Sequence, residues 1–229
     1  MIRGIQKVSF IDWPGKVCTV LFVGGCNFRC PFCQNPELVL SPENLPNISE
    51  DELMVFLKER QGWIDGVCIT GGEPTIWAGL PQLVQKIKSL GLGIKLDTNG
   101  SMPDVIEKMI DKKMLDYIAM DIKGPIEKYE KITRTNIDTE KIKRSVELIR
   151  KSGIPYEFRS TVLPKLHSKE DILKIAKWLK GAERFVLQQF RPEKTIDPTF
   201  QAEKPFTKEE LEEFKKALKP YFKIIEVRA

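Results

Sequence analysis

Short apolar runs alternate along this chain with longer amphipathic segments. Runs rich in valine, isoleucine and phenylalanine have the length and composition of β-strands. They cover residues 16–23, 66–70, 93–97, 116–121, 155–162 and 184–190. Strands that alternate with helices form parallel sheets whose faces are covered by those helices. The pattern therefore predicts an α/β fold around a six-stranded, open parallel sheet.

Amphipathic helical segments occupy the intervals between these strands. Ser49 and Glu52 form a capping-box pattern that begins a helix to about Arg60, and proline, glycine or a capping residue marks the other boundaries. The remaining predicted helices cover residues 81–90, 103–113, 138–152, 168–179 and 207–218. A last apolar run, 222–227, could add an edge strand.

No internal repeat or low-complexity linker divides the chain. With 229 residues, the chain is long enough for one well-formed core. We therefore expect a single domain over residues 1–229. Its core would cover about 16–191, and a C-terminal helix and edge strand would lie within 205–229.

Composition and charge indicate which kinds of partner this protein is expected to lack. Apolar residues make up 41% of the chain and charged residues 30%, and no apolar run approaches the ~20 residues of a membrane span. Residues 1–6 lack the layout of a secretory signal, so we expect a cytoplasmic protein. The net charge of +5 is spread among acidic residues without a basic, aromatic-rich stripe. We expect neither a membrane nor a nucleic-acid partner.

Three of the five cysteines lie close together in residues 24–36, a loop that also contains glycine and proline. Thiolates of Cys26, Cys30 and Cys33 could turn inward onto one polynuclear metal centre, and iron-sulfur clusters are held by thiolates at such short spacings. Cys18 and Cys68 instead lie in apolar strands, where free cysteine is commonly buried. A cluster with three protein ligands keeps an open iron position for a substrate or cofactor.

A zinc site and a disulfide pair are the alternatives for this loop. Zinc would need a fourth ligand, and the only histidine, His167, is far away in the sequence. A disulfide framework is uncommon in a cysteine-poor chain of this length without a signal peptide. Both alternatives are less favoured than an iron-sulfur cluster.

Polar residues follow almost every predicted strand, at the edge where parallel α/β folds bind ligands. Arg159 lies within a strand, so a carboxylate of ligand or protein should face it. The other polar segments are Thr70-Gly71-Gly72-Glu73, Asp97-Thr98-Asn99-Gly100, Asp121-Ile122-Lys123 and Gln188-Gln189. A simple turn, a helix cap or a surface lining would explain several of them equally well.

The Cys-x-x-x-Cys-x-x-Cys spacing, with Phe32 before the third cysteine and Gly-Gly-Glu after the next strand, resembles the radical S-adenosylmethionine (SAM) superfamily. The resemblance extends over residues 4–191 to the activating enzymes of glycyl radical enzymes. The matching segments are Ile11-Asp12-Trp13-Pro14-Gly15-Lys16, Cys33-Gln34-Asn35, Asp97-Thr98-Asn99-Gly100 and Asp121-Ile122-Lys123. Gly4 to Lys7 add a likeness to the activating proteins of anaerobic ribonucleoside-triphosphate reductases. Pyruvate formate-lyase activating enzymes share most of these segments.

This resemblance implies a radical SAM partial (β/α)6 barrel and two cofactors, a 4Fe-4S cluster and SAM. Cys26, Cys30 and Cys33 would bind the cluster, whose electron cleaves SAM to methionine and a 5′-deoxyadenosyl radical. That radical would remove a hydrogen atom from a glycine of a partner enzyme. The SAM site would comprise Phe32, Gln34, Asn35, Gly71, Gly72, Glu73, Asp97, Asp121, Lys123, Arg159 and Gln189. A monovalent cation would lie at Asp97, Thr98 and Asp121, and Asp12 would meet the glycyl loop.

Two positions depart from the family pattern. Gln34 stands where most members have histidine, and Gln189 stands near the position of the histidine beside the adenine. Both substitutions keep hydrogen-bonding capacity. No cysteine-rich insert lies between Cys33 and Cys68, so an external low-potential electron donor is expected. The alternatives are a radical enzyme with a small-molecule substrate and, in another class, a non-enzymatic iron-sulfur electron carrier.

Overall fold

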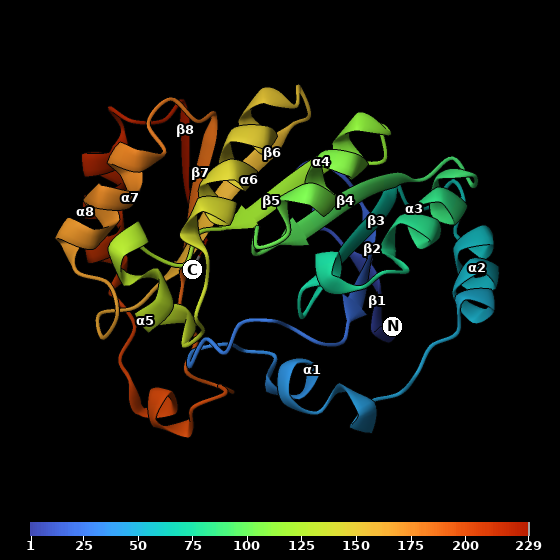
Figure 1. Ribbon diagram of the computed structural model, residues 1–229, viewed down its shortest axis with the longest axis horizontal. Coiled ribbons are helices and arrows are strands. Elements are labelled where there is room, and N and C mark those ends of the chain that lie inside the picture. Colours follow the sequence, from blue (N-terminus) through green and yellow to red (C-terminus); the bar gives the residue numbers. More distant parts are fainter. Residues whose placement is uncertain (229) are drawn as a thin grey trace.

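The computed structural model describes residues 1–228, which form one curved eight-stranded sheet (Figure 1). The strands lie side by side in sequence order; β1 runs antiparallel to β2, and all other neighbours are parallel. Their bounds are β1 Ile2–Ser9, β2 Cys18–Val23, β3 Gly66–Gly71, β4 Gly93–Thr98, β5 Tyr117–Asp121, β6 Tyr156–Val162, β7 Arg184–Gln189 and β8 Ile224–Arg228. The α/β partial barrel expected from the sequence is confirmed.

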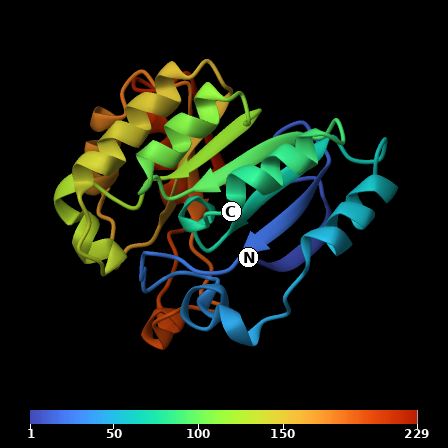
Figure 2. The ribbon, with the colours of Figure 1, turned by 45° about the vertical axis from the view of Figure 1, so that its right-hand side comes forward.

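The helices of nine residues or more cover the outer face of this sheet, as Figure 1 and the turned view in Figure 2 both show. The helices are α1 Pro36–Leu40, α2 Glu50–Glu59, α3 Leu80–Lys88, α4 Pro103–Asp111, α5 Tyr129–Thr133, α6 Thr139–Lys151, α7 Lys169–Trp178 and α8 Lys208–Leu218. Capping boxes at Ser49, Ser168 and Thr207 begin α2, α7 and α8. These boxes satisfy amide groups that would otherwise have no partner in the first helical turn.

The predicted strands and longer helices agree with the structure to within about two residues, but β1 was missed. Its sequence, IRGIQKVS, is only partly apolar, and most of its side chains are half-buried or exposed at the sheet edge. Helices α1 and α5 were also missed, since five residues are too few to show helical periodicity. The apolar run near the C-terminus does form an edge strand, β8.

The two faces of the sheet bury different residues. The outer face packs against the helices in a large apolar core that includes Leu21, Ile69 and Phe158. The inner face carries a small apolar cluster, in which Cys18 and Cys68 are fully buried beside Trp13. No helix within residues 1–228 is long and apolar enough to cross a membrane. The inner face turns polar toward the carboxyl ends of the strands, where the candidate site lies.

Candidate active site

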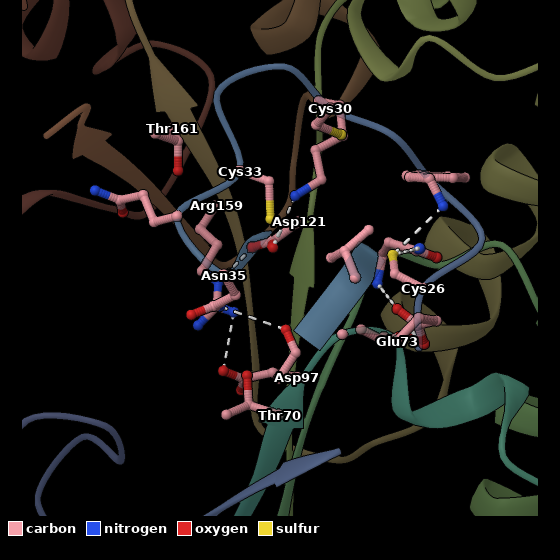
Figure 3. Close-up of a pocket in the computed structure, with 18 of the residues that line it drawn as sticks. Cys26, Cys30, Cys33, Asn35, Thr70, Glu73, Asp97, Asp121, Arg159 and Thr161 are labelled. Atoms are coloured by element: carbon pink, nitrogen blue, oxygen red, sulfur yellow. Dashed lines mark hydrogen bonds and ion pairs between the residues drawn. The ribbon is translucent and has the colours of Figure 1, made fainter. Parts of the chain in front are cut away.

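A cavity of about 360 Å³ lies at the carboxyl ends of the strands (Figure 3). The loop that carries the three neighbouring cysteines forms one wall, and β3 to β7 form the other. Its lining includes Cys26, Phe28, Cys30, Phe32, Cys33, Gln34, Asn35, Gly71, Gly72, Glu73, Asp97, Thr98, Asp121, Lys123, Arg159, Thr161 and Gln188. Most of the site residues that were predicted from the sequence therefore lie around one cavity of ligand size.

The cysteine loop is held by contacts with distant segments. The amide of Arg29 donates to the carbonyl of Thr133 (2.9 Å), and the amide of Ile196 donates to the carbonyl of Cys33 (3.2 Å). The amide of Asp197 donates to Pro31 (2.9 Å). These contacts come from α5 and from the segment after β7, and they hold the loop at the mouth of the cavity.

The three thiols are poorly solvated in this cavity. Burial raises the pKa of Cys26 to about 11 and that of Cys30 to about 12, and it also raises the pKa of Cys33. Lys123 opposes the shift at each position. Buried thiols that stay protonated are chemically inert, whereas a bound metal centre stabilises the thiolate form directly. The donor set therefore fits a cationic metal centre that these thiols ligate.

The sequence spacing of these three cysteines is typical of a polynuclear centre. Among the described residues, no three His, Cys, Asp or Glu side chains converge on a single-ion site. Cys18 and Cys68 lie away from the cavity, on the inner faces of β2 and β3. The described cysteines at the cavity are thus three, the set expected for a cluster with one open iron position.

The Gly-Gly-Glu segment binds the cysteine loop through its backbone. The amide of Gly72 donates to Val23 (2.8 Å), and the amide of Glu73 donates to the carbonyl of Gly25 (2.8 Å). A Cβ at Gly72 would overlap the carbonyl oxygen of Gly25, and Gly71 has a φ of +117°. Only glycine satisfies both conditions, so these residues set the distance between β3 and the cysteine loop.

Glu73 is a buried carboxylate surrounded by donors. Its oxygens accept hydrogen bonds from the hydroxyl of Thr98 (2.7 Å), the amide of Asn99 (2.6 Å) and both the amide and hydroxyl of Thr75. Burial raises the pKa of Glu73 in spite of these bonds. One oxygen accepts only the Asn99 amide, so it keeps capacity for a cationic ligand group.

A row of five alternating charges lies at the cavity, and all of its members except Lys95 line it. The guanidinium of Arg159 lies between two carboxylates; it contacts Asp97 (Nη2 to Oδ2, 2.9 Å) and also Asp121. Lys95 contacts the other oxygen of Asp97, and Lys123 contacts the other oxygen of Asp121 (3.0 Å). These five side chains carry three positive and two negative charges. The excess of one positive charge suits a ligand carboxylate.

The ion pairs decide the protonation states in this row. Burial by itself would raise the pKa of Asp121 and of Asp97, but Arg159 and the neighbouring lysines outweigh it, and both pKa values are lowered. The pKa of Lys123 is raised because Asp121 outweighs burial. All five groups are therefore charged at neutral pH. The carboxylates expected to face Arg159 belong to the protein itself.

One residue that the sequence predicted at the SAM site lies outside the cysteine cavity. Gln189 does not line the cysteine cavity; its amide donates to the carbonyl of Phe206 (2.7 Å). Because side chains alternate along β7, the neighbouring Gln188 faces the cavity instead. Gln34 donates to the carbonyl of Arg191 (3.0 Å), and Asn35 lies within 3.5 Å of the carbonyl of Gly71.

Several cavity residues had not been singled out from the sequence. Phe28 adds an apolar wall beside Cys26, and Thr161 follows Arg159 at a spacing of two on β6. Lys95, which does not line the cavity but contacts Asp97, precedes it by two residues on β4 in the same way. Side chains two residues apart on a strand face the same side of the sheet. Arg159 and Asp97 therefore each predict a second residue on the inner face.

The only histidine in the sequence stabilises a loop of the fold. His167 is buried; its Nε2 contacts the carbonyl of Lys123 (2.9 Å), and its Nδ1 faces the amide of Leu163 (3.4 Å). The neutral ring with the proton on Nε2 satisfies both contacts. It therefore supports the loop that carries Lys123 and is no candidate metal ligand.

This burial predicts a pH effect on stability. Burial lowers the pKa of His167. Its stabilising contribution is therefore present above the ordinary pKa of about 6.5 and is lost as the pH falls through it. Thermal unfolding midpoints of wild type and His167→Gln, measured from about pH 7.5 to about 5.5, should fall further for the wild type. The Met1 amine, whose pKa burial lowers to about 6, contributes to both proteins. Equal falls would contradict the assignment.

Comparison with protein families indicates which cofactors this cavity binds. The family model of the radical SAM superfamily matches residues 20–187. The chain belongs to the radical SAM superfamily. Radical SAM enzymes use a 4Fe-4S cluster and SAM, and the residues around the cavity fit both groups. The matched range contains the cysteine loop, the Gly-Gly-Glu segment and the row of charges.

Relatives place this radical SAM enzyme in the branch of glycyl radical enzyme activating enzymes. A protein of Methanocaldococcus jannaschii, provisionally named a glycyl-radical enzyme activating enzyme, is 34% identical over 100% of this chain and 95% of its own length. The pyruvate formate-lyase-activating enzyme of Staphylococcus epidermidis is 26% identical over 80% of this chain and 76% of its own.

A solved radical SAM structure shares the fold. A domain of a pyruvate-formate lyase-activating enzyme from Bacteroides vulgatus superposes with a TM-score of 0.59. It covers 72% of this chain and 99% of the domain, at 14% identity. At that identity the likeness concerns the arrangement of strands and helices alone.

Proposed function

We propose that this protein generates a glycyl radical on an anaerobic ribonucleoside-triphosphate reductase. The observation that carries the proposal is one cavity in which three cysteines face a carboxylate-binding row of charges, next to a second, open cavity. When bound, the cluster and SAM supply a 5′-deoxyadenosyl radical by one-electron reductive cleavage. Transfer of a hydrogen atom from a glycine Cα of the partner would then yield 5′-deoxyadenosine and the glycyl radical.

Different residues around the first cavity would bind the cluster and SAM. Cys26, Cys30 and Cys33 would ligate three irons of the cluster. Arg159, with the excess positive charge of its row, would bind the SAM carboxylate, while Glu73 would face the amino group. Gln188, rather than Gln189, presents an amide from β7 to the same space.

The aromatic residues of the loop would exclude water from the reacting atoms. Phe28 and Phe32 are almost fully buried and contribute apolar side chains to the lining. Such a wall limits quenching of a reactive intermediate by solvent. Their role needs no acid or base, which agrees with a reaction that moves a hydrogen atom rather than a proton.

The second cavity supports a macromolecular substrate. It has a volume of about 810 Å³ and lies between the loop of residues 10–14 and strands β7 and β8; Asp12, Gln34, Arg159 and Gln188 line both cavities. Phe10 and Ile11 at its rim are 75% and 82% exposed. Exposed apolar side chains beside a polar opening are typical of a surface that meets another protein. An inserted glycyl loop would pass them and reach Asp12.

Two partners fit this surface. The segment from Gly4 to Gly15 resembles activating proteins of anaerobic ribonucleotide reductases, which supports the first. The similarity to the Staphylococcus epidermidis relative supports pyruvate formate-lyase as the second candidate. We also propose an external low-potential electron donor, a cytoplasmic location and a single domain over residues 1–229.

Electron paramagnetic resonance of mixtures distinguishes these partners. The reconstituted, reduced protein and SAM would be mixed anaerobically with the ribonucleotide reductase or the formate-lyase of the same strain. We expect a glycyl radical doublet on the reductase, and none when SAM is omitted. A doublet on the formate-lyase alone would assign the second candidate. Deoxyadenosine without either doublet would contradict both and favour a small-molecule substrate.

A further inference from the structure

Lys95 is an ammonium group sealed inside the barrel. It lies in β4 between two apolar residues, and its side chain is 1% exposed. Its Nζ contacts Oδ1 of Asp97, lies 3.7 Å from the sulfur of Cys68 and is 5.9 Å from the ring centre of Tyr117. A lysine is rarely buried so completely unless it neutralises a charge, so its partner Asp97 explains its position.

The oxygens that would bind a monovalent cation already have partners. Arg159 and Lys95 take the two oxygens of Asp97, and Arg159 and Lys123 take those of Asp121. The hydroxyl of Thr98 donates to Glu73 (2.7 Å) and accepts from the amide of Gly100 (3.1 Å). Each carboxylate oxygen that the family resemblance assigned to a cation is therefore already paired with a cationic group of the chain itself.

The charge balance also disfavours an additional cation. Asp97 and Asp121 contribute two negative charges, against three positive charges from Lys95, Lys123 and Arg159. All five side chains are less than a third exposed. In the protein without SAM, a dissolved Na⁺ or K⁺ would raise the local excess to two positive charges in a poorly hydrated site, which is costly.

We propose that Lys95 is a built-in cation, whose ammonium group stands in for a dissolved monovalent cation at Asp97. Lys95 is a positioning residue: it holds Asp97, which holds the guanidinium of Arg159 at the SAM site. Binding of SAM by this protein then needs neither Na⁺ nor K⁺. The inference concerns the cofactor pocket, so it does not depend on which partner enzyme is activated.

Salt substitution tests this in the wild type without any variant. The affinity of the reconstituted protein for SAM would be measured by equilibrium binding in choline, sodium and potassium chloride at equal ionic strength. We expect dissociation constants within about twofold of one another, and a loss of about tenfold or more in choline would overturn the proposal. The unfolding midpoint of the full-length protein should likewise be equal in the three salts. A midpoint raised by Na⁺ or K⁺ would also overturn it.

Lys95→Met removes the charge but keeps much of the side-chain volume. Its midpoint in choline should lie well below that of the wild type, and Na⁺ or K⁺ should restore part of the loss by occupying the vacated place. Lys86→Met is the matched control, because Lys86 forms an exposed ion pair with Glu50; its midpoint should show no cation response.

The variant's outcomes are decisive. A Lys95→Met midpoint equal to that of the wild type, or a loss that no cation restores, would contradict the proposal. Folding of the variant only in Na⁺ or K⁺ would support it. If the variant folds in no salt, the wild-type binding measurement still decides.

Discussion

Replacing Cys30 by alanine should abolish both cluster binding and SAM cleavage. Cys30 lies at the centre of the cysteine loop, is almost fully buried, and lines the cavity together with Cys26 and Cys33. Two thiolates cannot hold a cluster that needs three protein ligands. After anaerobic reconstitution we expect iron and sulfide contents near the background level. We also expect a loss of at least about 10³-fold in deoxyadenosine formation, because without the cofactor the protein has no source of the radical.

Cys18→Ala is the matched control for this loss. Cys18 is also a buried cysteine, but it lies on β2 in the inner apolar cluster and lines neither of the two cavities described above. The substitution should cost about 1 kcal/mol of stability and leave the cluster intact. Wild-type levels of deoxyadenosine from Cys30→Ala would defeat the assignment of the loop.

Replacing Arg159 by methionine should remove SAM binding and destabilise the fold. The guanidinium lies between Asp97 and Asp121, and its side chain is only 13% exposed. Removing one partner of a buried ion pair typically costs about 3–5 kcal/mol. We expect about 3 kcal/mol in the free energy of unfolding by urea, near the lower limit, because each carboxylate keeps one lysine.

Arg144→Met provides the comparison on the surface. Arg144 also bridges two carboxylates, Asp104 and Glu107, but all three side chains are largely exposed. Exposed pairs contribute little, so this variant should unfold almost like the wild type. An Arg159→Met protein no less stable than Arg144→Met would contradict the importance of the buried row.

The pH dependence of this difference has a definite sign. The pKa values of Asp97 and Asp121 are lowered in the folded protein. Their contribution is therefore present above the ordinary pKa of about 4 and is lost as the pH falls below it. The stability gap between wild type and Arg159→Met should narrow in that range. A gap that widens in acid would show that the carboxylates are not the source of the effect.

Much of the fold could be predicted because its strands are short, apolar and regularly interrupted by helices. The parallel strands β2 to β7 and the capped helices follow from local pattern alone. Strand β1 could not be predicted in the same way, because an edge strand is half-exposed and its mixed sequence resembles a loop. Its place is set by pairing with β2, a contact that no local pattern encodes.

The candidate site was predictable to the extent that its residues stand in motifs. The cysteine spacing and the Gly-Gly-Glu segment lie next to strand ends, so strand order places them together. Gln188, and not Gln189, lines the cysteine cavity, because a step of one residue in a strand reverses the side that a side chain faces. Lys95 was missed because a lysine inside an apolar strand attracts attention only once its partner Asp97 is known to be buried.

The function of this protein depends on three cysteines that would hold a cluster with an open iron for SAM. Electron paramagnetic resonance of the reconstituted, dithionite-reduced protein, recorded with and without SAM, tests it most directly. We expect a reduced-cluster signal that shifts on addition of SAM, together with formation of 5′-deoxyadenosine. A cluster whose signal is unchanged by SAM, with no deoxyadenosine formed, would contradict it and favour an iron-sulfur electron carrier.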